Sequence, residues 1–553
     1  MMSNDRSTAE AGRPFDLPAI WGGGQLLAFS GLDGPTDYDN GLCGRTALDG
    51  AGIELLLPGR CLIRLGEKVQ SIGLLTGDAF DLATDAGRIQ GAFLDAHHLL
   101  IEGPCAVDCE SSALAVRRNG NRTLLGAAAH FDSSLIAANR PGAIADRERW
   151  LRAFRCDARL PEPRRRALAK ALSIMKTQVS SPEGLIRRPW TTPDRWPHRA
   201  LWLWDSAFHA IGWRHVDPAL ARAMLEAVLE TQHPDGLIPI TTTPSASHHL
   251  TQPPVLALAA WLVNEAAPEP GWLESLYPRL CRYVDWDLRN RDSDGHGLAE
   301  WFIQEYANCR SGESGMDNCS RFDPARPLDA VDFNAYLASE CELLARIAGR
   351  RRDAAGAARW REGHARLNGL MNDRLWDEDA GLYLDAFAGT DRRTGIPSCA
   401  SFLPLLSGAP DAARANRLLD RLESPALFGT PVPVPSVPPA AGPRLYTRDM
   451  WRGPMWVNMN WLIARGLDRY GFAENARALR QRTVEEIERW YERCGVFFEF
   501  YDDAGEAAPD TLPRKGRVGT VVRDYGWTAT LYVDLVLHLT GTAIAKADRS
   551  EPA

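Results

Sequence analysis

The spacing of apolar residues changes once along this chain, at about Ile144, and that change constrains the fold more than any other feature. Before it, short apolar runs alternate with Gly, Asp and Asn, as in β-strands separated by turns. After it, apolar residues recur with the 3.6-residue period of amphipathic helices. A chain of 553 residues is too long for one ordinary hydrophobic core. We therefore expect two domains, a β-rich one over residues 1–143 and a helical one over residues 144–545.

The apolar runs of the first part predict the strands of an antiparallel β-sandwich-like domain. They are Ile53–Leu57, Cys61–Leu65, Ser71–Leu75, Leu99–Ile101 and Leu114–Val116. A glycine-rich stretch over 22–34 precedes them. It fits a strand and a loop better than a phosphate-binding loop, because no helical pattern follows it.

Twelve stretches of the second part have helical periodicity. They cover residues 163–179, 203–213, 217–232, 253–266, 271–290, 328–348, 353–374, 396–406, 410–422, 453–469, 471–492 and 526–540. Short and long connections alternate between them, which suits six helical hairpins closed into a ring. The sequence therefore predicts a multidomain α+β protein in which a β-sandwich-like domain precedes an (α/α)₆ barrel.

Charge and cysteine usage narrow the classes of partner. The chain has 63 basic and 71 acidic side chains, and this balance argues against nucleic acid or an anionic membrane as the main partner. No run of about 18 apolar residues predicts a membrane span, and residues 1–14 lack the apolar core of a signal peptide. Eleven cysteines without paired metal-binding spacing favour reduced thiols in a cytoplasm. The oligomeric state is left open.

The densest polar cluster lies in a long loop between two predicted helices, over residues 313–323. It contains Asp317 and Arg321 with two glycines nearby, which suits the loop of a catalytic acid. A surface loop that caps the next helix is an equally favoured interpretation.

A second carboxylate, Glu499, stands in an aromatic run over residues 497–501. A carboxylate in such surroundings is costly unless it is paired, protonated or used in catalysis. Proton transfer would explain it. The alternative is a short strand whose alternation points Glu499 to water.

Two tryptophan-flanked segments, at 202–209 and 448–460, complete the set of candidates. Trp204 and Trp451 offer flat faces for a pyranose ring, while Asp205 and Arg452 can bind hydroxyl groups. Helix capping by Asp205 and core packing by Trp456 are the alternative interpretations. The chain has 18 tryptophans in all, and core packing can account for about half of them.

Together these segments resemble family 63 glycoside hydrolases, especially small bacterial members that include α-glucosidases and mannosylglycerate or glucosylglycerate hydrolases. The matching motifs are WLWDSAFH at 202–209, ESGMDNCSRFD at 313–323, LWDEDAGLYLD at 375–385, YTRDMWRGPMWVNMNWLIARGL at 446–467, FFEFYD at 497–502 and YGWTATL at 525–531. They follow one another in the expected order, so the resemblance covers most of the helical part.

The resemblance implies inverting, exo-acting hydrolysis of a small α-linked glucoside or related α-glycoside, with Asp317 as general acid and Glu499 as general base. An inverting pair of carboxyl groups lies roughly 6.5–9.5 Å apart, which leaves room for the attacking water. Glu499 needs a compensating hydrogen-bond donor, for which Arg452 and Tyr446 are candidates. The implied substrate-binding residues are Trp204, Asp205, Phe208, His209, Gln232, Asn318, Arg321, Tyr446, Trp451, Arg452 and Trp456. The expected partner is a small carbohydrate.

The sequence departs from the family pattern at two places in the acid's loop. Ser311-Gly312 stands where relatives often carry an aromatic residue, and Cys319-Ser320 stands where a small residue and proline are usual. The loop over 33–41 of the first part is a candidate for shaping the aglycone side. We expect catalysis without a metal or organic cofactor, because the helical part contains no thiolate–imidazole cluster and no phosphate-binding loop.

Other functions fit the same barrel. A sugar epimerase or isomerase would abstract protons with histidines, of which His209 and His233 are the candidates. A phosphorylase would replace the attacking water by phosphate, and Glu499 counts against it. A non-catalytic carbohydrate-binding protein would not need Asp317 and Glu499 to face one pocket.

Overall fold

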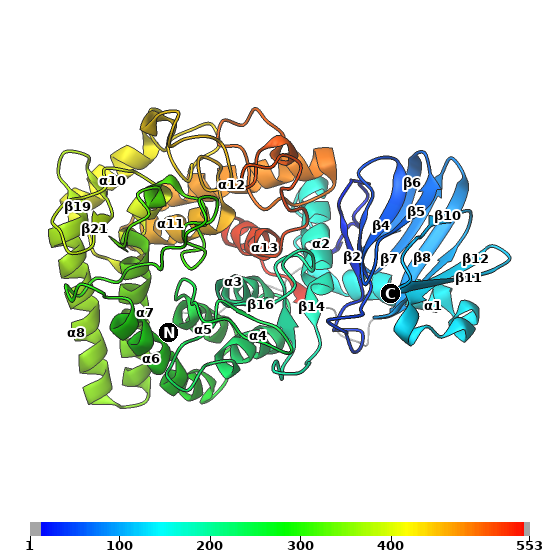
Figure 1. Cartoon of the computed structure of the whole chain (residues 1–553), viewed down its shortest axis with the longest axis horizontal. Helices are drawn as coiled ribbons and strands as arrows, with labels where there is room; N and C mark the ends of the chain where they lie inside the picture. The colour runs from blue at the N-terminus through cyan, green and yellow to red at the C-terminus, as the bar shows by residue number, and fades with distance from the viewer. Residues whose placement is uncertain (1–12, 547–553) are drawn as a thin grey trace, which may run out of the picture. The chain divides into compact units, whose positions relative to one another are not determined.

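The computed structural model describes residues 13–546, which form two compact units. The first consists of the described residues through Val179, together with Glu488–Val496 and the segment from Val536 onwards. The second consists of Ser180–Ile487 and Phe497–Leu535. Strands dominate the early part of the chain and helices the later part, as the blue-to-red colouring of Figure 1 shows. The prediction of antiparallel sheets followed by a helical part is confirmed.

Two antiparallel sheets form the core of the first unit. One has the strand order β10-β5-β4-β3-β2 and the other β11-β12-β9-β8-β7-β6. The strands of the first sheet are β2 (Leu26–Ala28), β3 (Cys43–Thr46), β4 (Ala51–Leu57), β5 (Cys61–Gly66) and β10 (Ala106–Asp108). Those of the second are β6 (Val69–Leu75), β7 (Ala79–Thr84), β8 (Gly87–Asp95), β9 (His98–Glu102), β11 (Leu114–Asn119) and β12 (Arg122–Ala127).

The alternation of side chains explains why the two sheets share one core. In β5, Cys61, Ile63 and Leu65 are buried while Arg64 between them is exposed, as the two-residue period of a strand requires. The buried residues of β5 join one apolar cluster with those of the other sheet, such as Phe80. Five of the strands were not predicted, namely β3, β7, β8, β10 and β12, because small and polar residues interrupt their apolar pattern.

Helices α1 (Arg140–Arg152) and α2 (Glu162–Thr177) complete the first unit. The periodicity predicted α2 but not α1, whose composition is largely charged. Helix α1 is started instead by local chemistry: the side chain of Asn139 accepts a hydrogen bond from the Gly142 N–H, and a proline occupies the first turn. A third, three-stranded sheet has the order β1-β13-β22, with β1 (Arg13–Pro14), β13 (Phe154–Cys156) and β22 (Ala545–Lys546).

The later helices follow the predicted stretches closely. They are α3 (Leu203–Trp213), α4 (Pro218–Glu230), α5 (Leu256–Ala266), α6 (Trp272–Asn290), α7 (Val331–Arg350), α8 (Ala354–Leu370), α10 (Ala412–Glu423), α11 (Val457–Arg469), α12 (Ala473–Cys494) and α13 (Gly526–Thr540). Neighbouring helices pack in pairs, α3 against α4 and α7 against α8. Aspartates start α4, α8 and α10, because Asp217, Asp353 and Asp411 each accept a backbone N–H of the first turn.

One predicted helix was wrong. Residues 396–406 form a 3₁₀ turn at Cys399–Phe402 and the four-residue helix α9 (Pro404–Ser407). Pro404 lies in the first turn of α9, a position that suits proline because its missing N–H would have no partner there. Gly408, in the left-handed conformation with φ 79°, ends α9. Among the helices of residues 13–546, none combines the length and the hydropathy needed to cross a bilayer.

Candidate active site

One cavity of the second unit is lined by both predicted catalytic carboxylates, Asp317 and Glu499. The empty space between its lining residues, open solvent included, is about 370 Å³. The remaining lining residues are Pro193, His198, Trp202, Trp204, Asp205, Gln252, Gly315, Met450, Trp451, Trp456, Arg514, Tyr525 and Trp527. Of the predicted substrate-binding residues, this cavity brings together Trp204, Asp205, Trp451 and Trp456.

Five tryptophans contribute to the wall of this cavity: Trp202, Trp204, Trp451, Trp456 and Trp527. Trp451 and Trp456 are stacked with ring centroids 3.7 Å apart, and Trp204 meets Trp527 edge-on at 5.2 Å. Flat indole surfaces suit contact with a sugar ring.

Arg514 supplies the compensating charge for Glu499. Its Nε donates to one carboxylate oxygen at 2.6 Å and its Nη2 to the other at 3.0 Å. Glu499 itself is only 2% exposed. The predicted donors were wrong, because both are engaged elsewhere: Arg452 forms a bidentate pair with Asp323, at 2.7 and 2.9 Å, and the Tyr446 hydroxyl donates to Asp503 at 2.9 Å.

The second carboxylate, Asp317, forms an ion pair with Lys515, whose Nζ lies 2.5 Å from Oδ2. Burial lowers the pKa of Lys515, but the charge of Asp317, the nearby Cys309 and the hydrogen bond to Asp317 together outweigh burial, so the net change is upward. A tight turn places the two cations, because the backbones of Arg514 and Arg517 exchange hydrogen bonds of 2.9 and 3.2 Å. Arg514 and Lys515, which are consecutive in one turn, thus form ion pairs with the two candidate catalytic carboxylates. The basic run at 514–517 was the signal in the sequence.

Asp205 lies on the cavity lining at the start of α3. Burial raises its pKa to about 7, so near neutral pH the carboxyl changes between the charged and the neutral form. Its Oδ1 lies 3.4 Å from the hydroxyl of Tyr525. Behind it, His198 Nδ1 lies 2.7 Å from Asp194, and Arg514 donates to His198 Nε2 at 3.2 Å. A neutral imidazole protonated on Nδ1 satisfies both contacts.

Several predicted substrate-binding residues lie outside the cavity lining. Phe208 and His209 are completely buried in α3. Burial lowers the pKa of His209 to about 3, and its Nδ1 lies 2.8 Å from the Thr191 hydroxyl. A buried, neutral histidine away from the cavity does not suit the proton abstraction of an epimerase. The Gln232 side chain donates to two backbone carbonyl oxygens, those of Gly236 and Arg279.

Two further predicted residues act within the protein. The Asn318 side chain accepts the N–H of Trp451 at 3.0 Å and thereby fixes a wall residue from a position next to Asp317 in sequence. Arg321 is completely buried between Asp332 and Asp385, to which its guanidinium donates. These side chains bind other parts of the protein. The sequence motifs therefore identify residues around the cavity as well as residues of its lining.

Two groups of side chains in residues 13–546 have three potential metal ligands within 4.8 Å of one another. One is Asp292, Asp294 and Glu300, in the long connection after α6. Backbone N–H groups already occupy oxygens of all three: Gly297 donates to Asp292, His296 to Asp294 and Ser293 to Glu300. The other group, Asp37, His97 and His130, lies in the first unit. Neither contributes to the lining of the cavity.

Known proteins resemble this chain in sequence over the region that contains the cavity. The family model of the mannosylglycerate hydrolase MGH1-like glycoside hydrolase domain matches residues 197–528. A mannosylglycerate hydrolase of Rubrobacter radiotolerans is 29% identical over 433 residues, which are 63% of this chain and 92% of the relative. A glucosylglycerate hydrolase of Mycolicibacterium hassiacum is 25% identical over 418 residues, 56% of this chain and 87% of the relative.

Solved structures agree with these matches. The family 63 mannosylglycerate hydrolase of Thermus thermophilus, in complex with glucose, is 26% identical with a TM-score of 0.55, over 66% of this chain and 99% of that one. A bacterial glucoamylase complexed with acarbose superposes with a TM-score of 0.61 over 98% of this chain and 97% of that one. At 10% identity, the second likeness concerns the fold alone.

Proposed function

The chain belongs to the mannosylglycerate hydrolase MGH1-like family of glycoside hydrolases, and from this premise we propose that it is an inverting, exo-acting hydrolase of a small α-linked glycoside. The observation that carries the proposal is the presence of Asp317 and Glu499 on one cavity. The residues come from loops 182 positions apart (499 − 317). The five tryptophans of the cavity lining support a carbohydrate ligand.

In the proposed reaction Glu499 is the base and Asp317 the acid. Glu499 takes a proton from water, and the water oxygen forms a bond to the anomeric carbon. On the opposite face the bond to the aglycone oxygen breaks, and Asp317 gives its proton to that oxygen. The bidentate contact of Arg514 keeps Glu499 charged, and therefore basic, in a buried position.

Lys515 supports a substrate whose aglycone is an acid. In the free protein the Lys515 ammonium group pairs with the Asp317 carboxylate. A general acid must carry a proton, so this ion pair has to break before Asp317 can act. A carboxylate on the aglycone would attract the same ammonium group and leave Asp317 free to be protonated. The named relatives are hydrolases of mannosylglycerate and glucosylglycerate. We infer the same class of substrate, a hexose α-linked to a small hydroxy acid.

We further propose that the helical part is an (α/α)₆ barrel. Pairs of helices such as α3–α4, α5–α6 and α7–α8 pack against each other along the chain, as six hairpins of an (α/α)₆ barrel would. We also propose the division into a β-rich domain, residues 1–143, and a barrel domain, residues 144–545. Limited proteolysis tests this division. No disulfide joins the eleven cysteines, all of which lie within residues 13–546, and this favours the cytoplasm as the compartment.

The experiment compares the two carboxylates. We expect Asp317→Asn and Glu499→Gln each to fold normally and to lose about 10²–10⁴-fold in turnover of glucosylglycerate or mannosylglycerate. An aryl α-glycoside with a good leaving group should rescue Asp317→Asn more than Glu499→Gln, because only the former lacks protonation of the leaving group. Asp323→Asn, in the same loop but bound to Arg452, is the control for general disturbance.

Proton NMR of the nascent product tests the stereochemistry. The β-anomer should precede the α-anomer when an α-glycoside is hydrolysed, because water attacks opposite the leaving group. An initial α-anomer would remove Glu499 from the role of a base acting through water. Near-wild-type turnover by either variant would remove that residue from catalysis.

A further inference from the structure

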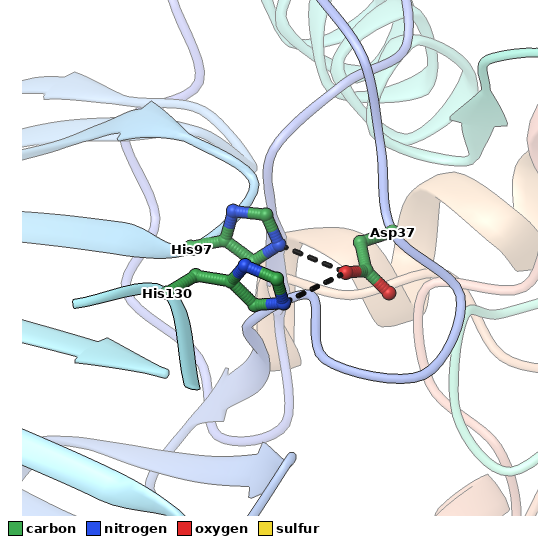
Figure 2. Close-up of side chains that lie close together, drawn as sticks. All are labelled: Asp37, His97 and His130. Atoms are coloured by element: carbon green, nitrogen blue, oxygen red, sulfur yellow. Dashed lines mark hydrogen bonds and ion pairs between the residues drawn. The ribbon is translucent and has the colours of Figure 1, made fainter. Parts of the chain in front are cut away.

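Three side chains from separate segments of the first unit converge on one point (Figure 2). Asp37 lies in the loop between β2 and β3, His97 in the turn between β8 and β9, and His130 at the end of the 3₁₀ turn Ala128–His130. His97 Nε2 lies 2.9 Å and His130 Nε2 3.7 Å from the same carboxylate oxygen, Oδ2 of Asp37. The two imidazole rings stack with centroids 4.2 Å apart and an interplanar angle of 21°.

The carboxylate of Asp37 is held so that only one oxygen faces the histidines. Its Oδ1 accepts the backbone N–H groups of Asp39 at 2.9 Å and Asn40 at 2.8 Å. These bonds orient Oδ2 toward both imidazoles, in the way that outer hydrogen bonds orient the ligands of known metal sites. The orientation of the Asp37 carboxylate is therefore set by hydrogen bonds within its own loop.

The backbone fixes His97 as well. Its N–H donates to Asp95 at 2.7 Å, and its carbonyl oxygen accepts the N–H of Ala127 at 3.0 Å. The second of these bonds joins the β8–β9 turn to the end of β12, three residues before His130. Two of the three side chains are thus positioned by hydrogen bonds of their own segments.

A hydrogen bond accounts for one histidine but not for the other. The 2.9 Å contact of His97 has normal geometry, whereas the 3.7 Å contact of His130 is too long for a hydrogen bond. Two ligands held about 2.0–2.1 Å from a tetrahedral zinc ion lie about 3.3–3.4 Å apart. The two contacts bracket that separation, and both Nε2 atoms point to the same side of the stacked rings (Figure 2).

We propose that Asp37, His97 and His130 bind a divalent transition-metal ion, zinc in the first place, through Oδ2 and the two Nε2 atoms. Two imidazoles and one carboxylate form a ligand set that zinc commonly accepts, with a fourth position left for water. All three side chains are partly exposed, so an ion can enter from solvent. The ion would tie together three segments of the β-sandwich. The proposal is independent of the glycosidase assignment, because the ligands and the catalytic carboxylates belong to different compact units.

The test uses the full-length, untagged protein, freed of metal by chelation and dialysis. Calorimetric titration with Zn²⁺ should give one site per chain, and Co²⁺ as a probe should give the visible absorption of a nitrogen- and oxygen-bound ion. His97→Gln and His130→Gln should each weaken Zn²⁺ binding by at least about 10–100-fold, the loss typical of an outer-shell change. His249→Gln, an exposed histidine outside the cluster, is the matched control and should bind as the wild type does.

Thermal unfolding gives a second readout. Zn²⁺ should raise the unfolding temperature of the wild type and of His249→Gln but not that of the two cluster variants. The unfolding temperatures in chelator should be similar for the wild type, His130→Gln and His249→Gln, since the half-exposed His130 makes no short contact with Asp37. His97→Gln also loses the 2.9 Å contact with Asp37, so its response to Zn²⁺ is measured against its own value in chelator. The absence of Zn²⁺ binding by the wild type, or binding of equal strength in the cluster variants and the control, would overturn the proposal.

Discussion

Replacement of Arg514 by glutamine tests the claim that one side chain keeps the catalytic base charged. Arg514 contacts both oxygens of Glu499, at 2.6 and 3.0 Å, and the carboxylate is 2% exposed. The other donor is the N–H of Val522, at 3.4 Å. Removal of one partner of a buried ion pair costs about 3–5 kcal/mol, because the remaining charge is left without compensation.

We therefore expect the acidic limb of the kcat–pH profile of Arg514→Gln to move to higher pH. Arg514→Lys should move it less, since an ammonium group keeps the charge but gives up the two-point contact. Arg517→Gln, exposed in the same turn, is the control and should leave the profile in place. An unmoved acidic limb in Arg514→Gln would refute the reasoning, as would a uniform loss of kcat at every pH.

Three further variants test other parts of the site and its support. Burial raises the pKa of Asp205 to about 7, well above the usual range of an aspartate, so its stabilising contribution is complete below about pH 4 and is lost as the pH rises through 7. Asp205→Asn should flatten the pH dependence of urea unfolding over this window, by up to about 1.4 kcal/mol per pH unit, and parallel curves would contradict the burial argument. Arg321→Met leaves Asp332 and Asp385 buried without their shared cation, so the free energy of unfolding should fall by about 3–5 kcal/mol, whereas an unchanged value would mean that water or protons replace it. Lys515→Met should lower kcat/KM for an acidic aglycone about 10–100-fold more than for an uncharged one, in line with a charge-assisted hydrogen bond, and equal losses would remove Lys515 from aglycone recognition.

The helices were predictable because their information is local. Apolar periodicity and Asp caps lie within a dozen residues of each other, as at Asp217 and α4, and the structure confirms them. The same pattern failed for α1, which lacks an apolar stripe, and for residues 396–406, although α6 was predicted correctly with Pro278 in its interior. The strands β7 and β8 were also not predicted, because pairing with neighbouring strands stabilises them more than their own composition does.

The site shows the same division between local and long-range information. Trp204 and Asp205 lie on one helical turn, so a single motif was enough to place them together on the cavity. The expected partners of Glu499, Arg452 and Tyr446, came from another family motif, whereas the structure supplies Arg514 from a turn that lies outside the motifs. Which of several cations reaches a carboxylate is decided by loop geometry, and loop geometry is set by contacts across the whole unit.

The three-stranded sheet of the first unit has a consequence for how the protein is made. Its middle strand, β13, pairs on one side with β1, where Arg13 faces Cys156, and on the other with β22, where Phe154 faces Lys546. The ribosome makes β22 only after 388 further residues (545 − 157), so during synthesis β13 has one neighbour and an open edge. The first part of the chain therefore emerges early but completes this sheet last. Its assembly waits for the synthesis of the helical part, and a fragment of the N-terminal half lacks a strand of this sheet.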